Sequence, residues 1–178
     1  MAGKIAIIGG GSAYAPGLLN AFIQHAAAFD GAELALMDIA AAELDVVQRL
    51  GSKLAAAAGA NLNITATVDL PRAIDGADYV LTTFRQGGFQ ARVRDERIPL
   101  QYGVIGQETI GPGGFFFAMR TLPVIKAIVA DIERLAPGAV LVNYTNPTQI
   151  VAEAVTHFTT IPCIAICDQS VDDARHLR

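Results

Sequence analysis

One segment of the chain combines glycines with side chains that can bind a polar ligand. Residues 103–114 hold five glycines, and Gln107, Glu108 and Thr109 lie among them. Neither a helix nor a strand favours that density of glycine, because glycine loses more conformational freedom on folding than any other residue. Loops of this kind often carry binding or catalytic groups. The segment therefore predicts a loop built around a ligand.

A second glycine-rich turn follows the first apolar segment. Residues 4–8 have the composition of a buried strand, and three glycines and a serine come directly after them. The first and third of these glycines match the start of the dinucleotide-binding fingerprint, which permits a tight turn and a close approach of the pyrophosphate to a helix N-terminus. Tyr14 takes the place of the last glycine of the fingerprint. The residues expected to bind the cofactor are Gly9, Gly10, Gly11 and Ser12.

Asp38 follows the second predicted strand, residues 33–37. A carboxylate at this position binds the ribose hydroxyls of NAD and repels the 2′-phosphate of NADP. The glycine turn and the acid together predict NAD as the cofactor. A second interpretation stays open, in which Asp38 is the N-cap of the helix that follows.

Arginines cluster within thirteen positions of an otherwise acidic chain. A guanidinium group can hold two oxygens of a carboxylate or phosphate at once, so the cluster predicts a local anion site. Because two acidic residues lie among the arginines, the alternative is a solvated charged segment in which at least two of them form internal salt bridges. The four arginines are Arg85, Arg92, Arg94 and Arg97.

Polar residues also follow the last two predicted strands, at the edge where open α/β sheets bind ligands. Asn146 precedes Pro147, so it can begin a helix as its N-cap while its side-chain amide faces a ligand. Cys167 and Asp168 follow the sixth strand, where a thiolate can bind a metal and a carboxyl group can act as an acid. Because no histidine lies near them in the sequence, the residue types alone favour a small buried thiol and a helix-capping aspartate.

Six segments with strand composition alternate with helical segments. This alternation predicts an α/β fold, namely a Rossmann-like doubly wound parallel sheet with helices on both faces. We expect residues 1–178 to form one NAD-binding domain. The predicted strands are residues 4–8, 33–37, 62–68, 79–84, 139–143 and 162–166.

Two intervals between the strands carry further expectations. Residues 40–58 show helical spacing, with one apolar face. Residues 85–114 are rich in arginine and glycine, and we expect them to form a long functional loop that leads to a helix starting near Phe115. The apolar face of the first interval consists of Leu44, Val47, Leu50 and Leu54.

The composition limits the class of protein. A chain of 178 residues that is 52% hydrophobic and 17% charged is globular rather than disordered. Its net charge of -4 argues against a nucleic-acid partner, which needs a basic face, and no apolar run approaches the ~18 residues of a membrane span. Cys163 and Cys167 would lie ~13 Å apart in a strand, too far for a disulfide. Free thiols predict a cytoplasmic location.

Several motifs spread over nearly all of the chain match one known family. They are residues 9–12, Arg92 with residues 95–96 and 98–100, residues 102–109, residues 113–114, Arg120, residues 143–147 and residues 150–154. In these motifs the chain resembles the NAD- and metal-dependent family 4 glycoside hydrolases, which do not use the usual pair of catalytic carboxylates. Cys167 followed by Asp168 resembles the 6-phospho-α-glucosidase branch, since β-specific members tend to place another residue after the cysteine.

The resemblance implies a redox elimination mechanism. NAD would take a hydride from C3 of the sugar, a base would remove the acidified proton on C2, the group on C1 would leave, water would add back and the hydride would return. A divalent metal, usually manganese, would hold the C2 and C3 oxygens. Carried over by position, Cys167 would be a metal ligand, Asp168 the general acid, Arg92 and Asn146 substrate contacts, and Glu108 a group that tunes the base.

The family's histidine metal ligand and tyrosine base have no match up to Arg178. We therefore expect the chain to correspond to the N-terminal part of a longer enzyme, without the family's C-terminal domain, and to bind NAD but to be inactive alone. The expected substrate is a phosphorylated sugar, a 6-phospho-α-glucoside. The full-length form is expected to be a homo-oligomer that binds neither nucleic acid nor a membrane.

Other functions stay open. Within the same family, the substrate could be a 6-phospho-β-glucoside, an α-galactoside or a galacturonide. An NAD-dependent 2-hydroxy acid dehydrogenase would share this sheet, but it needs a histidine near the substrate, and none of His25, His157 and His176 follows a strand convincingly. A non-catalytic nucleotide-binding module would bind NAD whether or not manganese is present, and Cys167→Ser would not change that binding.

Overall fold

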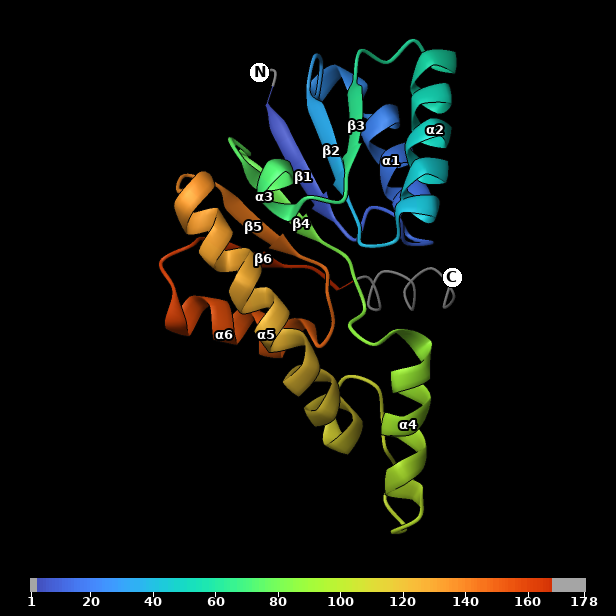
Figure 1. Cartoon of the computed structure of the whole chain (residues 1–178), viewed down its shortest axis with the longest axis vertical. Helices are drawn as coiled ribbons and strands as arrows, with labels where there is room; N and C mark the ends of the chain where they lie inside the picture. Colours follow the sequence, from blue (N-terminus) through green and yellow to red (C-terminus); the bar gives the residue numbers. More distant parts are fainter. Residues whose placement is uncertain (1–2, 168–178) are drawn as a thin grey trace, which may run out of the picture.

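A computed structural model describes residues 3–167, which form one twisted parallel sheet covered by helices on both faces (Figure 1). The order of the six strands is β3-β2-β1-β4-β5-β6, so the direction of winding reverses between β1 and β4. The expected Rossmann-like, doubly wound architecture is confirmed. The strands are β1 (Lys4–Ile8), β2 (Glu33–Met37), β3 (Asn63–Thr67), β4 (Tyr79–Thr82), β5 (Val140–Asn143) and β6 (Cys163–Ala165).

All six predicted strands are present, and their ends differ from the prediction by at most two residues. The side chains of β1 alternate between two buried faces, which explains why its sequence strongly predicted a strand. Ile5 and Ile7 are buried in a core on one face, whereas Ala6 and Ile8 are buried in a second core on the other face. A strand that is buried on both faces reads as a continuous apolar segment.

The helices divide between the two faces (Figure 1). One core joins the sheet to α1 (Ala15–Gln24) and α2 (Ala41–Ala57). The other core joins it to α3 (Leu70–Ile74), α5 (Gly111–Leu135) and α6 (Thr148–Phe158). A short 3₁₀ helix, η1 (Ala26–Ala28), links α1 to β2.

The buried face of α2 differs from the predicted one. The buried positions after Val47 are Gly51 and Ala55, whereas Leu50 and Leu54 are 39% and 38% exposed. A Cβ atom at Gly51 would lie 2.7 Å from the Cδ1 atom of Leu19 in α1, so a small residue is needed where the two helices approach. Contact with α1 therefore decides which side of α2 is buried, and the leucine spacing does not.

The expectation of a continuous loop over residues 85–114 was wrong. Its middle forms the helix α4 (Gly88–Leu100), and α5 begins at Gly111, before Phe115. The sequence of α4 lacks a broad apolar face, and its buried positions are only Ala91, Asp95 and Pro99. The helix is therefore stabilised mainly by packing against α5, as in most protein helices.

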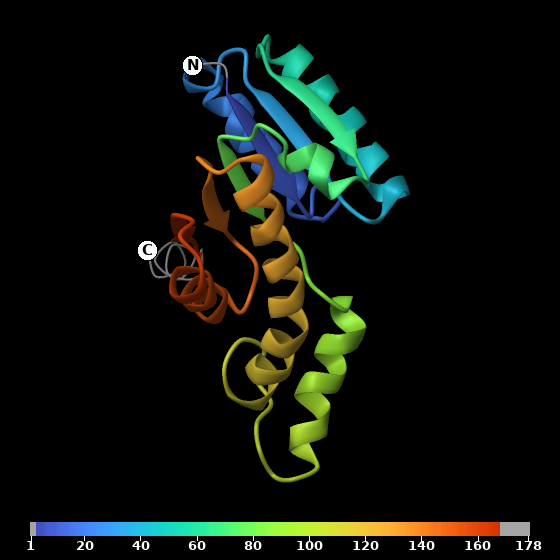
Figure 2. The same ribbon diagram turned by 60° about the vertical axis from the view of Figure 1, so that its left-hand side comes forward.

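Helix α4 and the first half of α5 lie side by side and extend away from the sheet (Figure 2). We call this pair, with the loop between them, the helical arm (residues 88–120). Although α5 has 25 residues, no helix within residues 3–167 is long and apolar enough to span a membrane.

Candidate functional site

The strand register brings the predicted site segments to one edge of the sheet. Ile8 lies opposite Met37 on one side and opposite Thr82 on the other. Thr82 lies opposite Asn143, and Asn143 lies opposite Ala165. The segments that follow these residues therefore emerge in one row, with the winding reversal at its centre. In open α/β sheets, ligands bind in the crevice at this edge.

The first two glycines of the turn after β1 are required by packing within the protein. The amide nitrogens of Gly9 and Gly10 both donate to the carbonyl oxygen of Met37, at 2.9 Å each. Gly9 has a φ of +96°, and a Cβ atom there would lie 2.2 Å from the carbonyl oxygen of Thr83. A Cβ atom at Gly10 would lie 2.9 Å from the Cβ atom of Leu36. The turn is thus held close against both neighbouring strands.

Asp38 fixes the third glycine of this turn. Its Oδ2 atom accepts a hydrogen bond from the Gly11 amide at 2.9 Å, and its Oδ1 atom accepts one from the Ala40 amide at 3.1 Å. The N-cap of α2 is Ala40, so the interpretation of Asp38 as the N-cap is wrong. A carboxylate offers about four acceptor positions, and the two amides leave room for ribose hydroxyls.

The turn has the features of a pyrophosphate cradle. The Oγ atom of Ser12 is buried and has no hydrogen-bond partner within residues 3–167, and a buried hydroxyl of this kind calls for a partner. A Cβ atom at Gly11 would lie 3.1 Å from the Asp38 carboxylate. A side chain at this position would therefore crowd Asp38, and glycine leaves the backbone accessible to a ligand. These residues fit a dinucleotide, and their role in binding it remains a prediction.

Tyr14, which replaces the last glycine of the fingerprint, is 65% exposed. Its ring meets the ring of Tyr144 edge to face, with the centroids 6.2 Å apart. The two tyrosines therefore connect the glycine turn to the segment after β5, across the end of β4. Such a contact between segments 130 residues apart cannot be read from the sequence.

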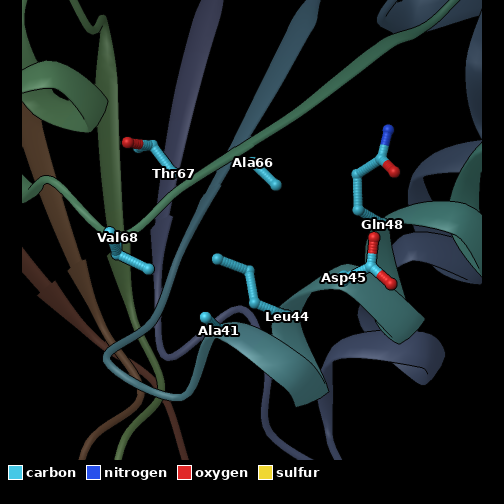
Figure 3. Close-up of a pocket in the computed structure, with 7 residues that line it drawn as sticks. All are labelled: Ala41, Leu44, Asp45, Gln48, Ala66, Thr67 and Val68. Carbon is cyan, nitrogen blue, oxygen red and sulfur yellow. The ribbon is translucent and has the colours of Figure 1, made fainter.

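A small cavity of about 220 Å³ lies at the same edge, between the start of α2 and the end of β3 (Figure 3). Its three polar side chains are already engaged, and the Thr67 hydroxyl accepts from the Asp69 amide at 3.1 Å. Asp45 pairs with Arg49 at 2.7 Å, and Gln48 donates to the carbonyl oxygen of Ile64 at 3.1 Å. The lining residues are Ala41, Leu44, Asp45, Gln48, Ala66, Thr67 and Val68.

The glycines of residues 103–114 serve close packing of the backbone. A Cβ atom at Gly106 would lie 2.6 Å from the Cα atom of Glu96 in α4, and one at Gly113 would lie 1.7 Å from the carbonyl oxygen of Gln107. The Gly113 amide donates to the Gly106 carbonyl at 2.7 Å. Gln107 is the one non-glycine residue of the described chain with positive φ, +59°. These contacts brace the loop against both helices of the arm, and its contact with a ligand remains a prediction.

Glu108 is held by two of the clustered arginines. Arg85 forms an ion pair with its Oε1 atom, and the Nη1 atom of Arg92 lies 3.4 Å from its Oε2 atom. Arg92 also donates from Nε to Glu96 at 2.7 Å. The hydrogen bond with Glu96 raises the pKa of Arg92, against the lowering effect of burial. The alternative of internal salt bridges for at least two arginines is therefore confirmed.

The remaining arginines of the arm differ in their surroundings. Arg120 in α5 pairs through both of its terminal nitrogens with Asp95 in α4, and Asp95 is only 8% exposed. The hydrogen bond with Asp95 raises the pKa of Arg120. Arg94 and Arg97 are exposed and have no ion pair within residues 3–167. Of the four clustered arginines, these two alone keep an uncompensated charge.

Asn146 lies beside the site, but it does not begin α6. The N-cap of α6 is Pro147, and the Oδ1 atom of Asn146 accepts a hydrogen bond from the hydroxyl of Thr148 at 2.9 Å. The predicted cap was therefore wrong by one residue. The half-buried amide group keeps its nitrogen available for a ligand, and that role stays a prediction.

Two neighbours of Asn146 in the motif of residues 143–147 hold the strand ends together, a role that sequence reasoning did not predict. Asn143 is fully buried and accepts from the hydroxyl of Thr82 at 2.8 Å. Thr145 is 1% exposed, and its hydroxyl accepts from the Phe84 amide at 3.1 Å. Their position at a strand end in an apolar chain is the signal that could have identified them, because buried polar groups need partners.

The expected metal ligand, Cys167, is exposed, so the alternative of a small buried thiol at this position was wrong. Within residues 3–167 no group of three His, Cys, Asp or Glu side chains could hold a metal ion. The described residues therefore do not make a complete metal site. Asp168 and the helix expected over residues 172–177 lie outside the described residues.

Residues 4–177 match the family described as Family 4 glycosyl hydrolase. The chain is 46% identical to the probable 6-phospho-beta-glucosidase of Bacillus subtilis, over 93% of the chain and 38% of that protein.

Two solved structures are similar to the described fold. One is a 6-phospho-alpha-glucosidase from gut microorganisms in complex with NAD and Mn²⁺, with a TM-score of 0.87, 34% identity and coverage of 96% of this chain and 39% of that chain. The other is the 6-phospho-beta-glucosidase of Thermotoga maritima with manganese, NAD⁺ and glucose-6-phosphate, with a TM-score of 0.89, 31% identity and coverage of 98% and 42%. The chain spans about two-fifths of the length of these relatives.

Proposed function

Because the chain belongs to the family 4 glycosyl hydrolases, we propose that the protein hydrolyses the glycosidic bond of 6-phospho-glucosides by an NAD-dependent redox elimination. The observation that carries this proposal is the meeting of two segments at one sheet edge. The glycine turn with Asp38 lies beside the end of β4, and Arg85, three residues after β4, holds Glu108. A redox glycosidase needs a cofactor cradle and fixed polar groups within reach of one sugar.

NAD, when bound, supplies a hydride acceptor for the sugar carbon that is oxidised. In our proposal the glycine turn lets the pyrophosphate approach the backbone closely, the buried Ser12 hydroxyl donates to it, and Asp38 accepts hydrogen bonds from the ribose. Solved relatives crystallised with NAD support this assignment. Arg92 and Asn146 contact the substrate, and Glu108 tunes the base that removes the C2 proton.

A divalent metal, manganese in the solved relatives, is part of the proposed mechanism. Cys167 provides one exposed candidate ligand, and residues 3–167 lack a complete ligand set. Asp168 as general acid remains a prediction from the resemblance.

We propose that these 178 residues bind NAD but do not turn over substrate alone. The chain covers 38–42% of the relatives compared above, and the expected base and histidine ligand have no match in it. The homo-oligomer expected for the full-length form is likewise a proposal.

The anomer of the substrate is predicted differently by two observations. The Cys167-Asp168 pair predicts the α anomer, whereas the relative at 46% identity is named for the β anomer and the solved α-glucosidase is 34% identical. Identity along the chain reports common ancestry, while the residue after the cysteine is the general acid that the resemblance implies. An assay with both anomers separates the two predictions.

The test is release of nitrophenol from the α- and β-glucoside 6-phosphates, with NAD and manganese each added or withheld. The longest open reading frame that contains this chain is assayed beside the 178 residues alone. Activity of the long form that needs both additives supports the proposal. Net NADH formation from malate or lactate, without glycoside hydrolysis, would instead identify a 2-hydroxy acid dehydrogenase.

A further inference from the structure

Arg85 lies where the cofactor side of the sheet edge meets the helical arm. The residue before it, Phe84, donates its amide to the hydroxyl of Thr145 at 3.1 Å. Two residues before it, Thr83 donates its amide to the carbonyl oxygen of Ile8 at 2.8 Å and packs against Gly9. The backbone leading to Arg85 is therefore fixed from both sides.

The guanidinium group of Arg85 is fixed as well. It lies over the ring of Phe89 in α4, 5.4 Å from the centroid, and over the ring of Phe117 in α5, 4.9 Å from the centroid. Phe117 is 2% exposed, so that ring cannot move without disturbing the core of the arm. Arginine stacks on aromatic faces by cation–π attraction, which holds the plane of its fork.

The fixed guanidinium group of Arg85 pairs with Glu108, whose carboxylate lies in the loop between α4 and α5. The Arg85 and Glu108 side chains are each 25% exposed, and they form an ion pair. The second cation on Glu108, Arg92, is farther away at 3.4 Å and is shared with Glu96. Arg85 is thus the arginine that has no other acidic partner within the described residues, and it contributes more to the orientation of Glu108.

We propose that Arg85 is a positioning residue. It is fixed at the sheet edge that carries the glycine turn, it holds the Glu108 carboxylate in place relative to that edge, and it thereby aligns this carboxylate for the reaction. The inference rests on the proposed function, in which Glu108 tunes the base. A lysine would keep the charge but lose the planar stacking and the fork. Glu108 without Arg85 would keep only its longer contact with Arg92.

The experiment compares Arg85→Met, Arg85→Lys and Arg97→Met in the longest open reading frame that contains the chain, assayed on nitrophenyl glucoside 6-phosphates. Methionine keeps an apolar side chain between the two rings, and Arg97 is an exposed arginine of the neighbouring helix α4 that forms no ion pair within residues 3–167. We expect Arg85→Met to lower kcat by about 10- to 100-fold, the range for loss of alignment at a reacting group. The KM for NAD should change less than about twofold, and Arg85→Lys should recover part of kcat.

A double-mutant cycle tests whether Arg85 acts through Glu108. If it does, Arg85→Met combined with Glu108→Gln is no slower than Glu108→Gln alone. Losses in kcat that multiply in the double variant would overturn the proposal, because Arg85 would then act independently of Glu108. Equal activity of Arg85→Met and Arg97→Met would also overturn it.

Hydrogen exchange separates this proposal from the proposed function. In Arg85→Met the amides of residues 103–110 should exchange faster than in the wild type, whereas Arg97→Met should leave them unchanged. If the wild-type protein hydrolyses no phospho-glucoside, the proposed function fails, and the exchange still reports whether Arg85 holds the loop. Unchanged exchange in Arg85→Met would refute the positioning role whatever the activity.

Discussion

Replacement of Gly9 by alanine is expected to destabilise the protein strongly, because two separate costs meet at this residue. Its φ of +96° is unfavourable for a residue with a Cβ atom, which costs about 1–2 kcal/mol. The added Cβ atom would also lie 2.2 Å from the carbonyl oxygen of Thr83. The backbone fixes the position of the Cβ atom and the carbonyl oxygen belongs to the backbone, so neither can rotate away, and overpacking of this kind costs about 1–3 kcal/mol.

The chain offers a matched control in Gly59. This glycine also has a positive φ, +65°, but a Cβ atom there would meet no atom within 4 Å. Gly59→Ala should therefore show only the backbone cost of about 1–2 kcal/mol, whereas Gly9→Ala should lose about 2–5 kcal/mol. For a domain of this size 1 kcal/mol shifts Tm by about 2–4 °C.

The assay is thermal unfolding of both variants and the wild type, followed by circular dichroism, with titration of NAD by calorimetry. We expect Gly9→Ala to melt at a clearly lower temperature than Gly59→Ala and to lose affinity for NAD, and Gly59→Ala to bind NAD normally. Equal melting temperatures of the two variants would refute the reasoning, because the clash with Thr83 would then contribute nothing.

Three further predictions concern separate parts of the molecule. Asp95→Ala should lower the free energy of unfolding, measured in urea, by about 2–4 kcal/mol, because it leaves a partly buried Arg120 without its partner. The control Asp45→Ala breaks an exposed ion pair and should lower it by less than about 1 kcal/mol. Equal losses in the two variants would contradict this prediction. Asp38→Ala should weaken NAD binding and reduce the preference for NAD over NADP, measured by calorimetry with both nucleotides, and an unchanged preference would remove Asp38 from the ribose site. Burial raises the pKa of the Cys163 thiol, so on raising the pH the unfolded state loses this proton before the folded state does. The contribution of Cys163 to the free energy of unfolding should be complete below the ordinary thiol pKa and should be lost as the pH rises through the raised value. Denaturant titrations at increasing pH should show a smaller loss in Cys163→Ala than in the wild type.

The candidate site was predictable where it depends on short segments. The glycine turn, Asp38 and Glu108 were all identified from residue types and spacing, since strand ends of a parallel sheet meet at one edge. The pairing of Glu108 with Arg85 was not predictable, because the two lie 23 residues apart and meet only through the packing of α4 on α5. For the same reason the role of Asn143 and Thr145, which hold the strand ends together, was not predicted.

The sequence by itself determined the strands, their parallel arrangement and the position of the glycine turn. These features follow from short continuous apolar segments, from their alternation with helical segments and from the glycines after the first strand, which are local properties of the chain. Only the tertiary structure decided that residues 88–100 form a helix, that α2 buries Gly51 in place of Leu50, and that the glycines of residues 103–114 brace a loop. Each of these depends on which surfaces meet, because packing between elements overrides weak local preferences.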